Sequence, residues 1–221
     1  MAFQSIFEVK LSSKLPENKL LLFFYLLIGS AVFVFVIGLL ALPPVWKMND
    51  SNYVVRFQTP GGFFENGHAH ANWVASESIP AVMKNMLISS EDFQYGSSTI
   101  TRQVVRSIYL GKDPTYLRKM QDIAGSTMLE SVLSKDEILA WYLNVIKFGE
   151  NVFGVKQAAR FYFAKETHEL TSLESTQLIV AISNPKKYGE QLTSKKFSEE
   201  FQSKTIELAW KCVSSGCLSN Q

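Results

Sequence analysis

The sequence predicts a mainly α-helical protein that starts with one long apolar helix. Three observations support this prediction. Apolar residues recur at helical spacing through most of the chain after residue 78. No run shows the apolar–polar alternation of half-buried strands, and an uncharged apolar stretch covers residues 20–42. Of the 221 residues, 47% are hydrophobic, which is enough for a folded core, and a net charge of +2 does not indicate a nucleic-acid partner.

Residues 20–42 have the properties of a transmembrane helix. As a helix they would extend roughly 34 Å, and the hydrocarbon core of a bilayer is about 30 Å thick. Pro43 ends the helix, and Trp46 is typical of a membrane interface. A cleaved signal peptide is the alternative, but its apolar core is shorter. Lysines before the stretch predict a cytoplasmic tail over 1–19 and an exported body.

The segment 43–72 is predicted to be a connector, and residues 73–221 to be the globular domain. The connector contains turn-forming residues, including Pro60-Gly61-Gly62, and shows little periodicity. His68 and His70 within it could bind a metal together, although a solvated loop is the more common role of such a pair.

Helices are expected to fill the domain. Capping boxes at Ser134–Glu137 and Thr171–Glu174 mark two helix starts. Cys212 and Cys217 near the C-terminus are either a small disulfide loop or two free thiols. Further helices are expected near residues 78–87, 100–108, 117–128 and 197–210.

One carboxylate pair has a candidate catalytic position. Glu91 follows an apolar helix and stands beside Asp92. Partial burial there would raise the pKa of Glu91 toward the range of a general base. An ordinary surface pair at a turn is the alternative.

A second candidate surface is polar and basic. Thr99, Arg102, Gln103 and Arg106 share one face of the expected helix, opposite its apolar side. Guanidinium groups match phosphate oxygens, so this face could bind a phosphate or diphosphate, although it could also be a solvated helix surface. Arg118 and Lys119 follow, and Asp122 is placed to pair with Arg118 within one helix.

Five blocks in order resemble the peptidoglycan glycosyltransferases (glycosyltransferase family 51), and within them the monofunctional biosynthetic transglycosylases. Together they cover residues 73–188. The blocks are Ser90-Glu91-Asp92-Phe93; Gly96-Ser97-Ser98-Thr99-Ile100-Thr101-Arg102-Gln103; Arg118-Lys119-Met120-Gln121-Asp122; Ser134 through Tyr142-Leu143-Asn144, Phe148-Gly149 and Gly154-Val155 to Tyr162-Phe163; and Glu169-Leu170-Thr171 with Asn184-Pro185.

The resemblance implies a lysozyme-like helical glycosyltransferase domain. It implies that lipid-linked disaccharide-pentapeptide (lipid II) is polymerised into glycan strands, with inversion and release of polyprenyl diphosphate. Glu91 would be the general base and Asp122 the second catalytic carboxylate. Lipid II, the nascent glycan chain, membrane lipid and other cell-wall synthesis or division proteins are the implied partners. The implied substrate-binding residues are Asp92, Thr99, Arg102, Gln103, Arg106, Arg118, Lys119 and Asn144.

The resemblance also implies a location and a cofactor. The catalytic domain would lie on the outer side of a bacterial inner membrane, anchored by a single span. No cofactor is required by the sequence itself, but a divalent cation, Mg²⁺ or Mn²⁺, could assist the departing diphosphate.

The chain departs from the family pattern directly after Phe93. Only Gln94 and Tyr95 separate it from Gly96, where the family has an extended segment with a His-x-Gly element. This departure favours an alternative, a catalytically impaired homologue that acts as a membrane scaffold or binds lipid II. A muramidase-like glycan cleaver is a third hypothesis, because the implied fold is lysozyme-like.

Overall fold

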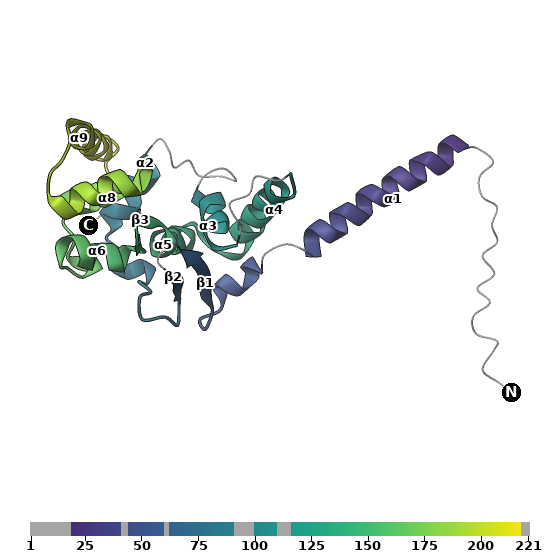
Figure 1. The fold of residues 1–221 in the computed structure, drawn as a ribbon, viewed down its shortest axis with the longest axis horizontal. Helices are drawn as coiled ribbons and strands as arrows, with labels where there is room; N and C mark the ends of the chain where they lie inside the picture. Colours follow the sequence, from purple (N-terminus) through teal and green to yellow (C-terminus); the bar gives the residue numbers. More distant parts are fainter. Residues whose placement is uncertain (1–18, 41–43, 60–61, 91–99, 110–115, 218–221) are drawn as a thin grey trace. The chain divides into compact units, whose positions relative to one another are not determined.

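The structure is a computed structural model that describes residues 19–40, 44–59, 62–90, 100–109 and 116–217. It divides into two compact units, Met1–Ala41 and Leu42–Gln221. In the first unit, helix α1 (Lys19–Leu40) is continuous and covers most of the predicted apolar segment (Figure 1). None of the described helices is both long enough and apolar enough to cross a membrane. The predicted transmembrane span is therefore not confirmed.

The second unit is mainly helical, as the sequence predicts. In Figure 1, α3 and α4 lie at one end of this unit, and α6, α8 and α9 lie at the other. The helices are α2 (Ala81–Ser89), α3 (Ile100–Ile108), α4 (Tyr116–Val132), α5 (Lys135–Val145), α6 (Val155–Phe163), α7 (Ser172–Ser183), α8 (Pro185–Ser194) and α9 (Glu199–Ser214), with short 3₁₀ turns η1 (Val45–Asn49), η2 (Ser76–Ser78) and η3 (Thr167–Glu169).

Helix α5 forms the centre of the second unit. It contacts α3, α6, β2 and η2. Trp141, Tyr142 and Leu143 in its middle are fully buried. A helix that is apolar on all sides has to be surrounded by other elements, and this explains why α5 separates the α3–α4 end from the α6–α9 end.

Both predicted capping boxes are confirmed. Ser134 accepts a hydrogen bond from the backbone N–H of Glu137, whose side chain accepts from the backbone N–H of Ser134. Thr171 and Glu174 form the same reciprocal pair at the start of α7. Each box satisfies two backbone donors that a helix start would otherwise leave unpaired.

The segment predicted to be a connector is instead part of the folded unit. An antiparallel hairpin joins β1 (Val54–Thr59) to β2 (Gly62–Gly67), with Val54 opposite Gly67 and Thr59 opposite Gly62. Val45 and Met48 in η1 are fully buried. The sequence lacks the alternation of a strand here because its inward residues are mixed: Val55 is apolar and Asn66 is polar, yet both are buried.

A second, shorter hairpin pairs β3 (Lys147–Gly149) with β4 (Val152–Phe153). It follows α5 directly and packs against α7 and α8. Gly154 ends the hairpin with a φ of 78°, a left-handed conformation that favours glycine. A Cβ there would come within 2.6 Å of the backbone oxygen of Asn144. This glycine therefore allows α6 to start directly after the strand.

Candidate functional site

The polar face of α3 lies as the sequence predicts. Ile100, Val104 and Val105 are buried on the opposite side of the helix. Arg102 and Gln103 are half-buried, and Gln103 Oε1 accepts a hydrogen bond of 2.9 Å from the Tyr142 hydroxyl. This bond attaches the polar face of α3 to the central helix α5.

Arg106 and Asp122 connect α3 to α4. The Arg106 Nε donates to Asp122 Oδ2 at 3.0 Å, and a terminal nitrogen of the same guanidinium donates to the same oxygen. The Asp122 side chain is 5% exposed and that of Arg106 is 48% exposed. Charge-assisted bonds of this kind are stronger than neutral ones. Asp122 therefore orients a guanidinium that still faces solvent.

This pair adds a partner that the sequence did not indicate. The sequence places Asp122 to pair with Arg118, four residues earlier, and the structure joins Asp122 to Arg106 on the neighbouring helix. Arg118 is half-buried and Lys119 is exposed. Both lie one helical turn before Asp122 and so on its side of α4. Arg106 thus meets a buried carboxylate on a helix that also carries Arg118 and Lys119, one turn earlier.

Two buried polar atoms at this end of the unit lack a hydrogen-bond partner among the described residues. They are Nε of Arg102 and Oδ1 of Asp122. Most buried polar atoms in proteins are paired, and exceptions often lie in sites that take a ligand. The two atoms are consistent with a binding surface on α3 and α4, because the Arg102 Nε can donate a hydrogen bond to a ligand and the Asp122 Oδ1 can accept one.

The residues that the structure describes do not form a metal site. Within them, no group of three His, Cys, Asp or Glu residues could hold an ion, and Asp122 supplies one carboxylate. His68 and His70 do not act as a pair either. His68 stacks on Trp73 with 4.4 Å between ring centroids, and its Nε2 lies 3.2 Å from the Met48 carbonyl oxygen. His70 Nδ1 accepts from the backbone N–H of Asn72. The predicted divalent cation stays a prediction.

Asn144 occupies the interior rather than a binding surface. Its side chain is fully buried, and Nδ2 donates to the carbonyl oxygens of Val74 and Ala140 at 2.8 Å each. Its Oδ1 accepts from the Val74 backbone N–H at 2.9 Å. With both amide hydrogens and the oxygen engaged, Asn144 secures the chain before η2 to α5. The Asn144 side chain therefore has no free hydrogen-bonding group for the predicted substrate contact.

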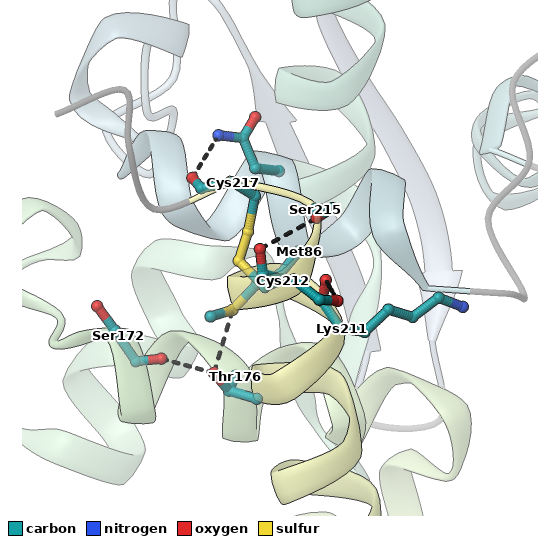
Figure 2. Close-up of a disulfide and its surroundings, with 9 residues drawn as sticks. Met86, Ser172, Thr176, Lys211, Cys212, Ser215 and Cys217 are labelled. Atoms are coloured by element: carbon teal, nitrogen blue, oxygen red, sulfur yellow. Dashed lines mark hydrogen bonds between the residues drawn. A yellow bond between two sulfur atoms is a disulfide. The ribbon is translucent and has the colours of Figure 1, made fainter.

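The remaining predicted site residues, Glu91, Asp92 and Thr99, lie outside the described residues. The helix that precedes Glu91 is described in full. Four residues on α2 are buried, among them Met86 and Leu87. The Thr176 hydroxyl of α7 lies 3.1 Å from the Met86 sulfur (Figure 2). The core thus holds α2 up to Ser89.

Two polar residues on α2 were missed by the sequence reasoning. The Lys84 ammonium, largely buried, donates to Asp136 Oδ1 at 2.8 Å and to the Ser76 hydroxyl at 3.1 Å. Asn85 Nδ2 donates to the Cys217 carbonyl oxygen at 3.0 Å. Both positions interrupt an otherwise apolar helix, and this interruption is the signal that could have identified them.

Cys212 and Cys217 form a disulfide, so of the two alternatives the bonded one is confirmed. Cys212 is fully buried at the end of α9. Figure 2 shows the bond beside α2, with Met86 and Thr176 next to it. This C-terminal disulfide (Cys212–Cys217) and the Asn85 bond together attach the end of α9 to α2.

Comparison with known proteins finds several similar sequences. A biosynthetic peptidoglycan transglycosylase of Paraburkholderia xenovorans is 30% identical over 144 residues, which cover 53% of this chain and 60% of that protein. Another of Chromobacterium violaceum is 31% identical over 144 residues, covering 53% and 63%. One of Nitrosomonas europaea is 29% identical over 172 residues, covering 66% and 68%.

The chain thus spans about 60% of the length of the first of these relatives. The family model described as Transglycosylase matches residues 78–208, which include α2 to α8 and most of α9. Because this match covers more than half of the chain, the chain belongs to the transglycosylase family.

Proposed function

We propose that this chain is a peptidoglycan glycosyltransferase that polymerises lipid II into glycan strands. The 4-hydroxyl oxygen of the acceptor sugar attacks the anomeric carbon of the growing chain. A new glycosidic bond forms, the bond to the polyprenyl diphosphate breaks, and the configuration inverts. Glu91 takes the proton of the attacking hydroxyl as general base.

The observation that carries this proposal is the Arg106–Asp122 pair. The leaving diphosphate concentrates negative charge, and preorganised donors stabilise such charge without having to reorganise during the reaction. Asp122 fixes the Arg106 guanidinium at 3.0 Å through Nε, while about half of the Arg106 side chain stays exposed. Arg118 and Lys119, one turn earlier on α4, add positive charge. The described residues offer one carboxylate here, so we derive no step through a metal.

The other predicted residues complete the proposed site. Gln103, attached to Tyr142, supports the polar face of α3, and Arg102 supplies a buried donor without a partner among the described residues. Asp92 and Thr99 are proposed to bind substrate on the strength of the family pattern.

The proposed substrate places the protein in the bacterial cell envelope. The relatives are biosynthetic peptidoglycan transglycosylases by name, and peptidoglycan is an envelope polymer. Single-pass anchoring in the inner membrane, contact with membrane lipid and association with other cell-wall or division proteins belong to the same proposal. The C-terminal disulfide agrees with an oxidising compartment outside the cytoplasm.

Strand synthesis in vitro tests the function. Detergent-solubilised full chain is incubated with purified lipid II, and polymer is separated on a gel. The wild type should form polymer, and Glu91→Gln should not. Glu77→Gln is a matched control, because Glu77 is exposed in η2 and lies on neither α3 nor α4; this variant should polymerise like the wild type.

Two other outcomes would each replace the proposal. Binding of lipid II without polymer would support the scaffold, which the short segment between Phe93 and Gly96 favours. Release of soluble fragments from mature peptidoglycan would support a muramidase-like cleaver.

A further inference from the structure

A cavity of about 490 Å³ is lined by residues of the β3–β4 turn, α6 and α8. In Figure 1, α6 and α8 lie at the end of the second unit away from α3 and α4. The volume of the cavity lies within the range of pockets that bind small molecules, about 300–1,000 Å³. None of the predicted site residues that the structure describes lines it. It is therefore separate from the described polar surface on α3 and α4.

The base of the cavity is tightly packed. Tyr162 is buried and donates its hydroxyl hydrogen to the Phe148 carbonyl oxygen at 3.1 Å. Glycines allow the hydroxyl to reach this point: a Cβ on Gly149 would lie 2.1 Å from it, and one on Gly189 would lie 2.8 Å from it. The base is thus held by contacts that a larger residue would break.

The rim combines one exposed aromatic ring with polar groups. Phe161 lines the cavity and is 59% exposed. Glu150, Lys186 and Glu190 also line it and are exposed. In the part of the chain that the structure describes, these three charged groups form no ion pair with one another or with other residues. Their hydrogen-bonding capacity is therefore available to a ligand.

This chemistry suits a sugar better than a phosphate. Two carboxylates and one ammonium give the rim a net negative charge, which repels a polyanion. Carboxylates accept hydrogen bonds from hydroxyl groups, and an ammonium donates to their oxygens. The C–H face of a pyranose ring can lie on the electron-rich face of Phe161. An apolar base with a few polar groups at the rim is typical of ligand pockets.

We propose that this cavity is a second saccharide site, which binds a segment of a β-linked, N-acetylated amino-sugar strand. The inference rests on the proposed function for its choice of strand, because a glycan polymerase makes such a strand. The site binds sugar rings by stacking on Phe161 and by hydrogen bonds to Glu150, Lys186 and Glu190, and it performs no chemistry.

Calorimetric titration of the detergent-solubilised full chain with chitotetraose tests the site. We expect binding with a Kd of about 1 mM or tighter. Phe161→Ala and Glu190→Gln should each weaken it by about fivefold or more. Trp210→Ala and Glu207→Gln are matched controls, an exposed aromatic residue and an exposed carboxylate on α9, outside the cavity; they should leave the Kd unchanged.

Three results would overturn the site: no binding of chitotetraose, equal affinity for wild type and Phe161→Ala, or binding of a lysine-containing tripeptide in place of the sugar. The titration needs no turnover, so it is independent of the polymerisation assay. Binding that depends on Phe161 in a chain that makes no polymer would retain the site and reject the proposed activity. Polymer formation by a chain that does not bind chitotetraose would retain the proposed activity and reject the site.

Discussion

Replacement of Asn144 by alanine should destabilise the second unit strongly. The change removes the partner of the Val74 N–H and of the Val74 carbonyl oxygen, both of which lie in a buried region. Each unsatisfied buried group costs about 1–3 kcal/mol, so the free energy of unfolding should fall by about 2–6 kcal/mol. The lost Ala140 contact adds less, because that carbonyl lies within helix α5.

Urea unfolding of the full chain, followed by circular dichroism, measures this loss. Asn72→Ala is the matched control: Asn72 is exposed, and its replacement should change the free energy of unfolding by no more than about 0.5 kcal/mol. The m-value should stay constant, as expected for a pure change in stability. A loss below about 1 kcal/mol for Asn144→Ala, together with weaker lipid II binding, would refute the structural role and restore the substrate contact.

Three further predictions concern other parts of the unit. Arg106→Gln should abolish most polymer formation and lower the free energy of unfolding by about 1–2 kcal/mol. This loss is smaller than for a fully buried pair because Arg106 is half exposed. Recovery of stability in the double variant with Asp122→Asn would identify the pair, and unchanged polymerisation would contradict the role of Arg106. Reduction of the C-terminal disulfide should lower the free energy of unfolding by about 2 kcal/mol, as expected for a short loop, and an unchanged melting temperature in dithiothreitol would show that the bond is dispensable. Burial alone raises the pKa of Glu174, but hydrogen bonds from Lys165 and Thr171 outweigh it and hold the pKa below its usual range. The resulting contribution to stability is complete at neutral pH and is lost as the pH falls below about 4.5. Glu174→Gln should therefore make the free energy of unfolding depend less on pH in that window.

The elements that were predicted correctly depend on residues close together in the chain. The caps at Ser134 and Thr171 require only a partner three residues later. The buried face of α3 follows from the spacing of Ile100, Val104 and Val105. Such features can be recognised within one short segment, even when the rest of the fold is unknown.

The features that were missed depend on residues far apart in the chain. Asp122 pairs with Arg106, 16 residues earlier in the chain, because the packing of α3 on α4 brings this cation to a buried carboxylate. His68 was expected in a solvated loop, but it stacks on Trp73 and meets Trp141 on α5 edge-on. These contacts appear only when the β1–β2 hairpin is folded against the helices.

The attachments of α2 determine how a variant at Glu91 can be interpreted. Lys84 binds Asp136 at the start of α5, Asn85 binds the backbone carbonyl of Cys217, and Met86 packs into the core. These contacts come from three separate parts of the unit, and they are made by residues 84–86 of the helix that precedes Glu91. Glu91→Gln should therefore leave the free energy of unfolding within about 0.5 kcal/mol of the wild type. A loss of polymer in that variant would then report on the transfer of the proton and not on the fold.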